Sequence, residues 1–324
     1  AAGALLRLVA RAAAVGLGGW FAWYTLILTR AAKKTTPWGP RWLAVFASGV
    51  LNKFGRWWLD YTDNVEEVIS KSIFGPGKQY VMAWHPHGAF TVAAVYFISH
   101  WWATDFPNCI RGDRFVCVAP LLLKIPILAE FLLLCHARSQ DSETFDRLLR
   151  KGSTVAVQPG GLIEQVATDA TREQIFFPAR LGFVRLALKH GVPLLPVYAF
   201  GENQLYRTSG WTRGLNRWFY RRLKTGNLVV IGQGGLPTTP ALPNPLMLPV
   251  YKAGLHIRFG EPVPIGGPIE EPSEEQVQEA FQKYVVELRR VFDAHKDECL
   301  PPEVAAKGLQ VIHRGQGQDK SSKL

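Results

Sequence analysis

Residues 79–102 read QYVMAWHPHGAFTVAAVYFISHWW. The apolar segment at 79–84 predicts a short buried strand, and the apolar run that follows predicts a helix over 89–102. The turn His85-Pro86-His87-Gly88 lies between them, so two imidazoles stand at the N-terminus of a helix. The helix dipole disfavours imidazolium there, which keeps a histidine neutral and able to accept a proton. The turn therefore fits general-base chemistry, and it equally fits a plain turn whose histidines bond to nearby carbonyls.

Outward from this turn, short apolar strands alternate with helical patterns. This alternation is typical of an α/β sheet covered by helices. Strands are expected at 79–84, 114–118, 154–157, 194–199, 227–231 and 255–259, and helices at 89–102, 125–135, 141–150, 180–190, 211–224 and 273–296. The helix at 273–296 has a capping box and a continuous apolar stripe, so we expect it to pack on the core without a catalytic role.

The composition favours contact with a membrane or an anionic ligand. The chain has 324 residues, a formal net charge of +11, 48% hydrophobic residues and 11 Trp. Basic and Trp-rich sequences are typical of proteins that bind a membrane surface or an anionic ligand such as a coenzyme. No nucleic-acid recognition signature is visible, so we expect no nucleic-acid partner.

The N-terminal region predicts a membrane segment. Residues 12–29 carry no charge, and about 20 apolar residues span a bilayer. A cleaved signal peptide is the alternative, although the apolar part of a signal peptide is normally shorter. We expect an anchor over 1–58 (one span or a hairpin), a globular domain over 59–300 and a loose polar tail over 301–324. Basic residues after the apolar run favour a cytosolic globular domain.

A second polar cluster follows the predicted strand at 154–157. It reads Gln158-Pro159-Gly160-Gly161, with Glu164 three residues later. Exposed amides in such a turn can hold an oxyanion or a phosphate. Glu164 could orient an imidazole, and a solvated glutamate beside a plain turn is the simpler alternative.

A third cluster spans residues 180–203. Arg180 opens a helical pattern and could bind an anionic head group through two hydrogen bonds, or it could be a surface arginine. The next strand ends in Phe200-Gly201-Glu202-Asn203. Polar residues at the carboxyl end of a strand lie where α/β sheets place their active sites.

Two further segments have apolar character. The helix at 211–224 places Arg213, Arg217 and Arg221 on one face, beside an apolar stripe of Leu215, Trp218 and Phe219. Such a helix can lie on an anionic membrane, and an ordinary surface helix fits equally well. The run LLLKIPILAEFLLL at 121–134 could line an acyl-chain tunnel, touch lipid or form a buried helix.

Other chemistries find little support in the pattern. His85 and His87 form an HxH pair, but no third ligand has a diagnostic spacing, so we expect no metal. The sequence also lacks a GxSxG elbow, a dinucleotide fingerprint and a Walker A motif.

Taken together, the chain resembles the diacylglycerol acyltransferase type 2 family, which includes monoacylglycerol and wax-alcohol O-acyltransferases. Four blocks carry the resemblance, and they are His85-Pro86-His87-Gly88, Pro159-Gly160-Gly161 with Glu164, the run RLGFVRLALKHGVPLLPVYAFGENQLY at 180–206, and Gly260-Glu261-Pro262-Val263. The resemblance covers roughly residues 55–300. It implies a glycerolipid-acyltransferase-like sheet and an acyl-CoA-dependent O-acyltransferase.

The resemblance also implies the substrates and the site. Acyl-CoA would be the co-substrate without any cofactor, and the acceptor would be a neutral lipid alcohol, diacylglycerol first. A monoacylglycerol, fatty alcohol, phytol or sterol acceptor stays open, as does an inactive lipid-binding protein. Catalysis is assigned to His85, His87 and Glu164, and substrate binding to Pro86, Gly88, Pro159, Gly160, Gly161, Arg180, Gly182, Phe183, Phe200, Gly201, Glu202 and Asn203.

Three positions depart from the family pattern. The family's Tyr-Phe-Pro element has no match near Tyr61, and its His-Gly-Arg-Gly-type stretch is replaced by Ile231-Gly232-Gln233-Gly234. Related glycerolipid acyltransferases place an aspartate five positions after the histidine, where this chain has Phe90 or Val92. Glu164 is therefore the expected replacement, and the choice of His85 or His87 as the base stays open.

The expected location is the endoplasmic reticulum membrane, with contact to lipid droplets and a homo-oligomer as a possible assembly. The terminal Ser322-Lys323-Leu324 matches a peroxisomal import signal, which makes the peroxisome the alternative.

Overall fold

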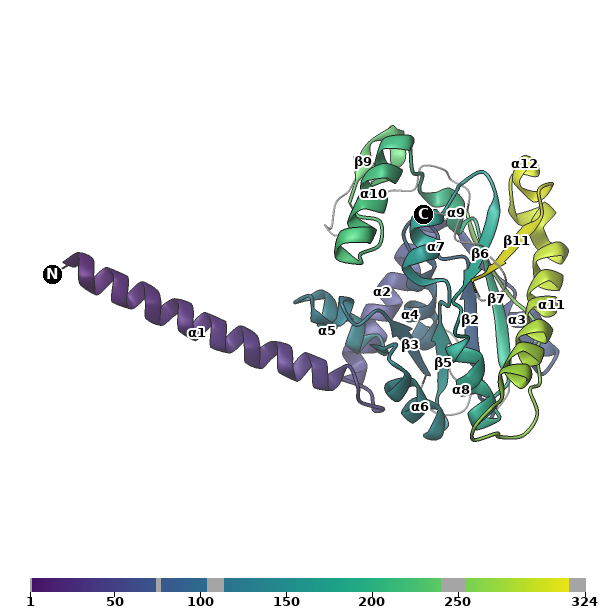
Figure 1. Cartoon of the computed structure of the whole chain (residues 1–324), viewed down its shortest axis with the longest axis horizontal. Helices are drawn as coiled ribbons and strands as arrows, with labels where there is room; N and C mark the ends of the chain where they lie inside the picture. The colour runs from purple at the N-terminus through teal and green to yellow at the C-terminus, as the bar shows by residue number, and fades with distance from the viewer. Residues whose placement is uncertain (1, 74–76, 104–113, 240–253, 315–324) are drawn as a thin grey trace.

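The computed structural model describes residues 2–73, 77–103, 114–239 and 254–314, and its centre is a seven-stranded sheet (Figure 1). The strand order is β1-β10-β7-β2-β5-β3-β4. Strands β7, β2, β5, β3 and β4 run parallel, β10 is antiparallel to β7, and β1 is parallel to β10. The bounds are β1 Tyr61–Asp63, β2 Val81–His85, β3 Arg114–Val118, β4 Ala137–Ser139, β5 Thr154–Val157, β7 Leu194–Phe200 and β10 Leu255–Phe259.

Helices cover both faces of this sheet, so the predicted α/β architecture is confirmed. The helices of the described residues are α1 Ala2–Ala31, α2 Arg41–Leu59, α3 Val65–Ser70, α4 Ala93–Ala103, α5 Leu128–Leu134, α6 Ser142–Arg150, α7 Gly161–Ala167, α8 Gly182–His190, α9 Glu202–Leu205, α10 Gly210–Leu223, α11 Glu274–Cys299 and α12 Pro302–Ala305. In Figure 1, α11 lies on one side of the sheet, with α2 and α4 on the other.

The side chains of β2 alternate between the two faces of the sheet, and each face packs against its own hydrophobic core. Val81 and Ala83 pack in a cluster with side chains of α6, α8 and α11, whereas Met82 and Trp84 pack in a cluster with side chains of α4. Successive side chains of a strand point to opposite faces, and a strand buried on both faces is a continuous apolar run. The apolar run before His85 therefore forms a central strand that is buried on both faces of the sheet.

Several elements differ from the sequence-based expectation. Helix α4 begins at Ala93 rather than at residue 89, because the segment after the turn first passes Glu202, whose carboxylate caps the helix. The segment at 227–231 contributes only β8 (Val230–Ile231), which pairs with β9 (Pro237–Thr238) outside the main sheet. Short strands such as β1 and β4 were not predicted, since three residues give no readable period.

The C-terminal segment is ordered further than predicted. Strand β11 (Leu309–His313) pairs in parallel with β6 (Glu173–Phe177), which the sequence analysis also missed. The expectation of a loose tail from residue 301 is therefore wrong for the part up to β11. Ser322-Lys323-Leu324 lies outside the described residues.

Helix α1 projects away from the rest of the molecule (Figure 1). Its C-terminal end packs against the region of α5, through Leu28 and Ala31 beside Ala129 and Leu133. Within the described ranges, no helix combines the length and the apolar character that a bilayer crossing requires.

Candidate active site

Three polar turns lie side by side at the carboxyl-terminal ends of the central strands. Strands β2, β5 and β7 are parallel neighbours, so their carboxyl ends point the same way. His85 ends β2, Gly160 and Gly161 follow β5, and Gly201 follows β7. The topology therefore brings together the three clusters that the sequence analysis selected.

His85 is fully enclosed. Its side chain has 0% exposure, its ring packs edge-on against Phe177 at 4.9 Å, and its Nε2 atom lies 3.1 Å from the hydroxyl oxygen of Tyr284. Burial lowers the pKa of His85 to about 3, so the ring is neutral at physiological pH. A substrate cannot reach this ring without displacing core side chains.

His87 is the more accessible of the two histidines. It keeps part of its surface open, whereas His85 and Pro86 beside it are buried. Burial of the ring lowers the pKa of His87 to about 4, so this imidazole is also neutral near pH 7. Its Nδ1 atom is buried and has no hydrogen-bond partner among the described residues. A neutral imidazole can accept a proton from a hydroxyl group that is bound within hydrogen-bonding distance of an unprotonated ring nitrogen.

Glu164 holds the backbone of the turn rather than an imidazole. One carboxylate oxygen accepts a hydrogen bond from the backbone N–H of His87, and the other accepts from the N–H of Phe176 at 2.7 Å. Burial raises the pKa of Glu164 to about 8, against the opposing effect of the two N–H donors. The expectation that Glu164 orients an imidazole directly is therefore replaced by a contact with the main chain of His87.

Glu202 supports the other end of the same turn. Its two carboxylate oxygens accept hydrogen bonds from the N–H groups of Val92 (2.7 Å) and Ala93 (2.8 Å), at the start of α4. These are the N–H groups that a helix leaves without partners inside the helix. Gly88 has a φ of +66°, and a Cβ atom there would lie 2.8 Å from the Cγ of Glu202. Glycine is therefore required where the turn passes this carboxylate.

Gln158 ties the second turn to the first. Its amide nitrogen donates to the carbonyl of Pro86 at 2.9 Å, and its amide oxygen accepts from the hydroxyl of Thr91 at 2.7 Å. Gly160 lies against Glu164, and a Cβ atom at Gly160 would be 2.0 Å from a carboxylate oxygen. Pro159 and Gly161 flank this contact at the partly accessible start of α7.

The remaining predicted substrate residues divide between the core and the surface. Phe183 and Phe200 are buried in the core cluster that contains Tyr284, and Asn203 donates to the buried Glu173 at 3.0 Å. Arg180 and Gly182 are exposed at the start of α8. Gly201 has a φ of +88°, and a Cβ atom there would be 2.1 Å from the carbonyl oxygen of Gly254. In this structure Phe183, Phe200, Gly201 and Asn203 pack inside the domain and do not line an open site.

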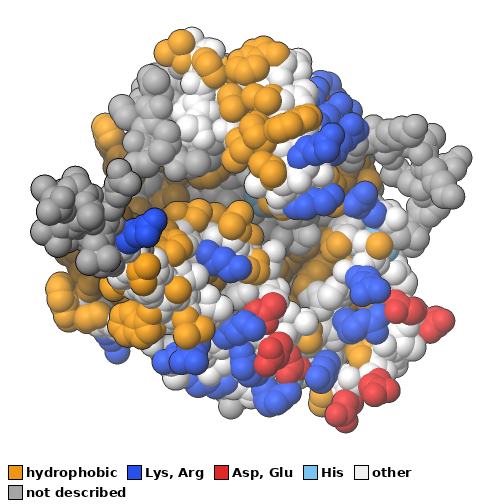
Figure 2. All heavy atoms as spheres, turned by 60° about the vertical axis from the view of Figure 1, so that its left-hand side comes forward, with side chains coloured by type: hydrophobic (Ala, Val, Ile, Leu, Met, Phe, Trp, Pro, Cys, Tyr) orange, Lys and Arg blue, Asp and Glu red, His pale blue; other side chains and the backbone are white. Residues whose placement is uncertain are grey.

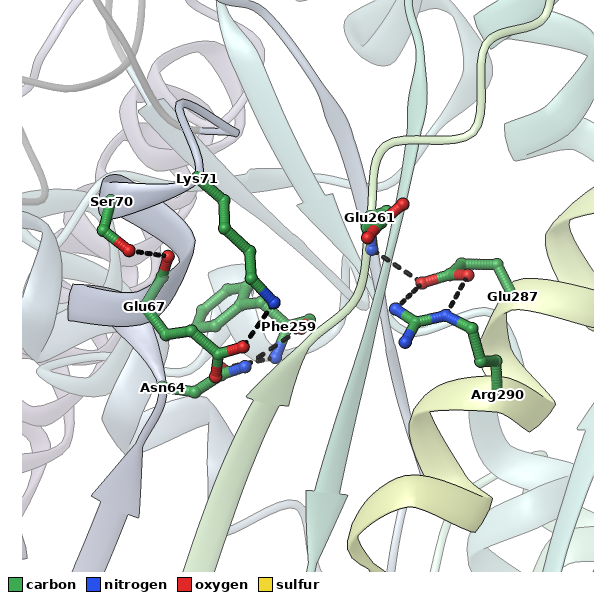
Figure 3. Close-up of polar contacts among 8 residues, drawn as sticks. All are labelled: Asn64, Glu67, Ser70, Lys71, Phe259, Glu261, Glu287 and Arg290. Atoms are coloured by element: carbon green, nitrogen blue, oxygen red, sulfur yellow. Dashed lines mark hydrogen bonds and ion pairs between the residues drawn. The ribbon is translucent and has the colours of Figure 1, made fainter.

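The fourth motif block, Gly260-Glu261-Pro262-Val263, lies at the opposite end of the strands, beside the amino-terminal end of β7. Because β10 is antiparallel to β7, its carboxyl end at Gly260 points away from the His-Pro-His-Gly turn. The backbone N–H of Glu261 donates to Glu287 of α11 at 2.7 Å, and Glu287 pairs with Arg290 (Figure 3). On the neighbouring segment, Asn64 bonds to the backbone of Phe259 and Glu67 pairs with Lys71 (Figure 3). This block attaches β10 to α11 and is structural.

Sequence reasoning missed three residues of the site. Gln158 belonged to a quoted motif but received no role, and Tyr284 was assigned to packing because its spacing fits the apolar stripe of α11. Glu173 is buried at the start of β6 and accepts hydrogen bonds from Tyr198 (2.6 Å), Asn203 and Gln204 (2.8 Å). Burial raises the pKa of Glu173 to about 7. An acidic residue inside an unrecognised strand offered no local signal.

Metal ligands do not gather around the two histidines. In the described part of the chain, no group of three or more His, Cys, Asp or Glu side chains could hold a metal ion.

Comparison with known proteins agrees with this geometry. The family model described as diacylglycerol acyltransferase matches residues 52–305, which include every residue assigned to the site. No solved structure matches the chain.

Similar proteins are named as O-acyltransferases with several acceptors. The chain is 31% identical to acyl-CoA wax alcohol acyltransferase 2 of Homo sapiens, over 74% of this chain and 73% of that protein. It is 29% identical to 2-acylglycerol O-acyltransferase 1 of Homo sapiens (73% and 71%) and 27% identical to diacylglycerol O-acyltransferase 2 of Bos taurus (70% and 63%). The resemblance seen in the four motif blocks is thereby confirmed. The chain belongs to the diacylglycerol acyltransferase family and is an acyltransferase enzyme.

Proposed function

We propose that the protein transfers an acyl group from acyl-CoA to the hydroxyl group of a neutral lipid alcohol, with His87 as the general base. The observation that carries the proposal is the difference in burial between the two histidines of the turn, His85 and His87. His85 is completely buried in the core, whereas His87 is a half-buried residue with a neutral ring, and Glu164 fixes its backbone. Of the two histidines, His87 is therefore the one that we propose meets the substrate.

The chemistry follows from this arrangement. The imidazole of His87 takes the proton of the acceptor hydroxyl as its oxygen attacks the thioester carbonyl. Backbone amides near Gly160 and Gly161, or near Gly88, are our candidates to stabilise the oxyanion that forms. The carbon–sulfur bond then breaks, and the CoA thiolate receives the proton from the imidazolium. General-base catalysis of this kind contributes ~10²–10⁴-fold.

Diacylglycerol is the acceptor we propose first, which makes the product a triacylglycerol. A fatty alcohol is the second candidate, because a wax alcohol acyltransferase is among the relatives with 30% identity or more. The identities to the wax-alcohol, monoacylglycerol and diacylglycerol enzymes differ by only a few per cent. The acceptor must therefore be measured.

The test is an acceptor panel. Membranes that contain the protein are incubated with labelled acyl-CoA and, separately, with diacylglycerol, monoacylglycerol, a fatty alcohol, phytol or a sterol. We expect ester formation with diacylglycerol to exceed that with every other acceptor. Transfer to a different alcohol would change the acceptor, and lipid binding without transfer to any alcohol would favour an inactive lipid-binding protein.

We also propose that the enzyme works at a lipid surface, and the orientation of α10 supports this. The residues that α10 buries are polar, since Thr212 and Asn216 have 0% exposure. Asn216 donates to the carbonyl of Val229 at 2.6 Å and accepts from the N–H groups of Leu228 and Val229. Trp211 and Trp218 are instead 58% and 53% exposed. A helix in water normally buries its apolar side, so this inverted arrangement suits an apolar environment.

The same side of the molecule carries more apolar surface. Figure 2 turns toward the viewer the side from which α1 projects, and apolar side chains gather there in patches with Lys and Arg between them. Exposed apolar residues on α1, α2 and the α5 region include Trp20, Trp23, Trp42, Phe46, Trp57 and Ile127. We propose that this side contacts the endoplasmic reticulum membrane or a lipid droplet, with the catalytic domain in the cytosol. Imaging the chain with and without residues 322–324 distinguishes this location from the peroxisome.

A further inference from the structure

Tyr284 lies in the middle of α11, and its hydroxyl group contacts both His85 and the strand that carries it. The hydroxyl donates a hydrogen bond to the carbonyl oxygen of Ala83 at 3.0 Å, and the same oxygen lies 3.1 Å from Nε2 of His85. A tyrosine hydroxyl has one hydrogen, and a carbonyl oxygen can only accept. Since that hydrogen points to Ala83, the oxygen offers a lone pair to His85. We infer that Nε2 of His85 carries the ring proton, and that Tyr284 is a positioning residue that holds the catalytic turn through it.

The surroundings of His85 agree with a positioning role. Its Nδ1 atom is buried and has no hydrogen-bond partner among the described residues, and the ring has no exposed surface. Phe177 covers one side of the ring, and Phe183 packs against Tyr284 with ring centres 5.6 Å apart. His85 therefore presents one functional group, its Nε2–H, and presents it to Tyr284.

Two anchors then fix neighbouring parts of the turn. Tyr284 holds the side chain of His85 from the α11 face of the sheet, and Glu164 holds the backbone N–H of His87. The base is thus placed by contacts on both sides of Pro86. This inference rests on the proposed function, in which His87 accepts the proton, and it gives helix α11 a role in the site beyond packing.

The first test compares two tyrosines that share the same kind of hydrogen bond. Tyr284→Phe removes the hydroxyl that faces His85. Tyr80→Phe is the matched control, because Tyr80 is also buried and donates to a backbone carbonyl, that of Ile73, but it precedes β2 at the opposite edge of the sheet. We expect Tyr284→Phe to lower kcat on the order of 10- to 100-fold with an unchanged KM for acyl-CoA, as misplacement of a catalytic group does. Equal kcat values in the two variants would overturn the inference.

The second test asks whether His85 acts only as a donor. The side-chain amide of glutamine can donate a hydrogen bond from a position close to that of Nε2, but it cannot act as a base. We expect His85→Gln to retain most of the activity that His85→Ala loses, and His87→Gln to be as inactive as His87→Ala. We also expect Tyr284→Phe to have little further effect in the His85→Ala background. A His85→Gln variant as inactive as His85→Ala would contradict a donor role.

The third test determines the tautomer of His85 by nuclear magnetic resonance and does not depend on enzyme activity. The chain has 8 histidines, and the signals of His85 in a spectrum of ¹⁵N-histidine-labelled full-length protein are those that His85→Gln removes. We expect a protonated Nε2 and an unprotonated Nδ1, and we expect Tyr284→Phe to mix the two tautomers. A protonated Nδ1 in the wild type would overturn the inference. Absence of acyl transfer by the wild type would instead count against the proposed function and leave this readout intact.

Discussion

The carboxylate of Glu164 accepts a hydrogen bond from the backbone N–H of His87, and its second oxygen accepts from Phe176 at 2.7 Å. Both N–H groups need an acceptor because they are removed from water. A buried carboxylate therefore joins the turn after β2 to strand β6. It controls where His87 lies without touching the imidazole.

Replacement of Glu164 by glutamine tests this contact. Glutamine has one acceptor oxygen, so its amide group would face one of the two backbone N–H groups. We expect kcat to fall on the order of 10- to 100-fold while KM for acyl-CoA changes little, because the base is displaced. Glu279→Gln on the exposed face of α11 is the control and should behave as the wild type. A wild-type rate in Glu164→Gln would remove the carboxylate from the account.

Gly160→Ala tests the same contact without changing a polar group. The new Cβ atom would lie 2.0 Å from a Glu164 oxygen, so the carboxylate must move. We expect a loss of activity as large as in Glu164→Gln and a destabilisation of about 1–3 kcal/mol, the usual cost of overpacking. At Gly267, an exposed position outside the site, no atom lies within 4 Å of the corresponding position, and Gly267→Ala should be neutral in both measurements. Similar activity in the two alanine variants would contradict the packing argument.

The acidic limb of the pH–rate profile reports the base. Burial lowers the pKa of His87 to about 4, so the imidazole is able to accept a proton at all higher pH values. We therefore expect protonation of His87 to lower kcat/KM only below about pH 5. Burial raises the pKa of Glu164 to about 8, so the profile is measured in Glu164→Gln as well, which removes that titration from the range between pH 8 and 5. The measurement is initial-rate acyl transfer at acceptor concentrations well below KM across this range. A half-maximal rate near pH 6.5 would indicate a base with the ordinary histidine pKa.

The exposed tryptophans of α10 are expected to contribute to membrane contact. The double change Trp211→Ser and Trp218→Ser removes apolar surface that the fold does not bury, so stability should change little. We expect weaker binding to vesicles that contain anionic lipid, measured by flotation of the full-length protein. Val286→Ser is the control, since Val286 is 68% exposed on α11. Equal loss of binding in the control would show that the effect is not specific to α10.

The central strands β2, β5 and β7 could be predicted from the sequence because their side chains are mainly apolar on both faces of the sheet. Strands β3, β5 and β10 match their predicted bounds, and the three turns that end β2, β5 and β7 were selected from local chemistry alone. The parallel order of these strands then brings the turns together. The expected roles of His85, His87 and Glu164 stay predictions until activity is measured.

What the sequence could not show depends on contacts across the sheet. Tyr284 is 199 residues from His85, and its position on an apolar stripe gives no sign of a polar contact. Strand β11 pairs with β6 across more than 130 residues, and polar residues interrupt both short strands, Glu173 and Gln174 in β6 and Gln310 in β11. Glu202 was selected as a substrate residue, yet its carboxylate caps α4. The roles of these residues and strands can be recognised only when the three-dimensional fold is known.

The most direct test of the central claim is the rate of acyl transfer from labelled acyl-CoA to diacylglycerol by His87→Ala and His87→Gln, beside the wild type and His85→Gln. Our account predicts that both His87 variants lose at least ~100-fold in rate, the magnitude of general-base catalysis. It also predicts that their amount in the membrane is unchanged and that His85→Gln remains active. Near-wild-type transfer by either His87 variant, with His85→Gln inactive, would contradict the assignment of His87 as the base.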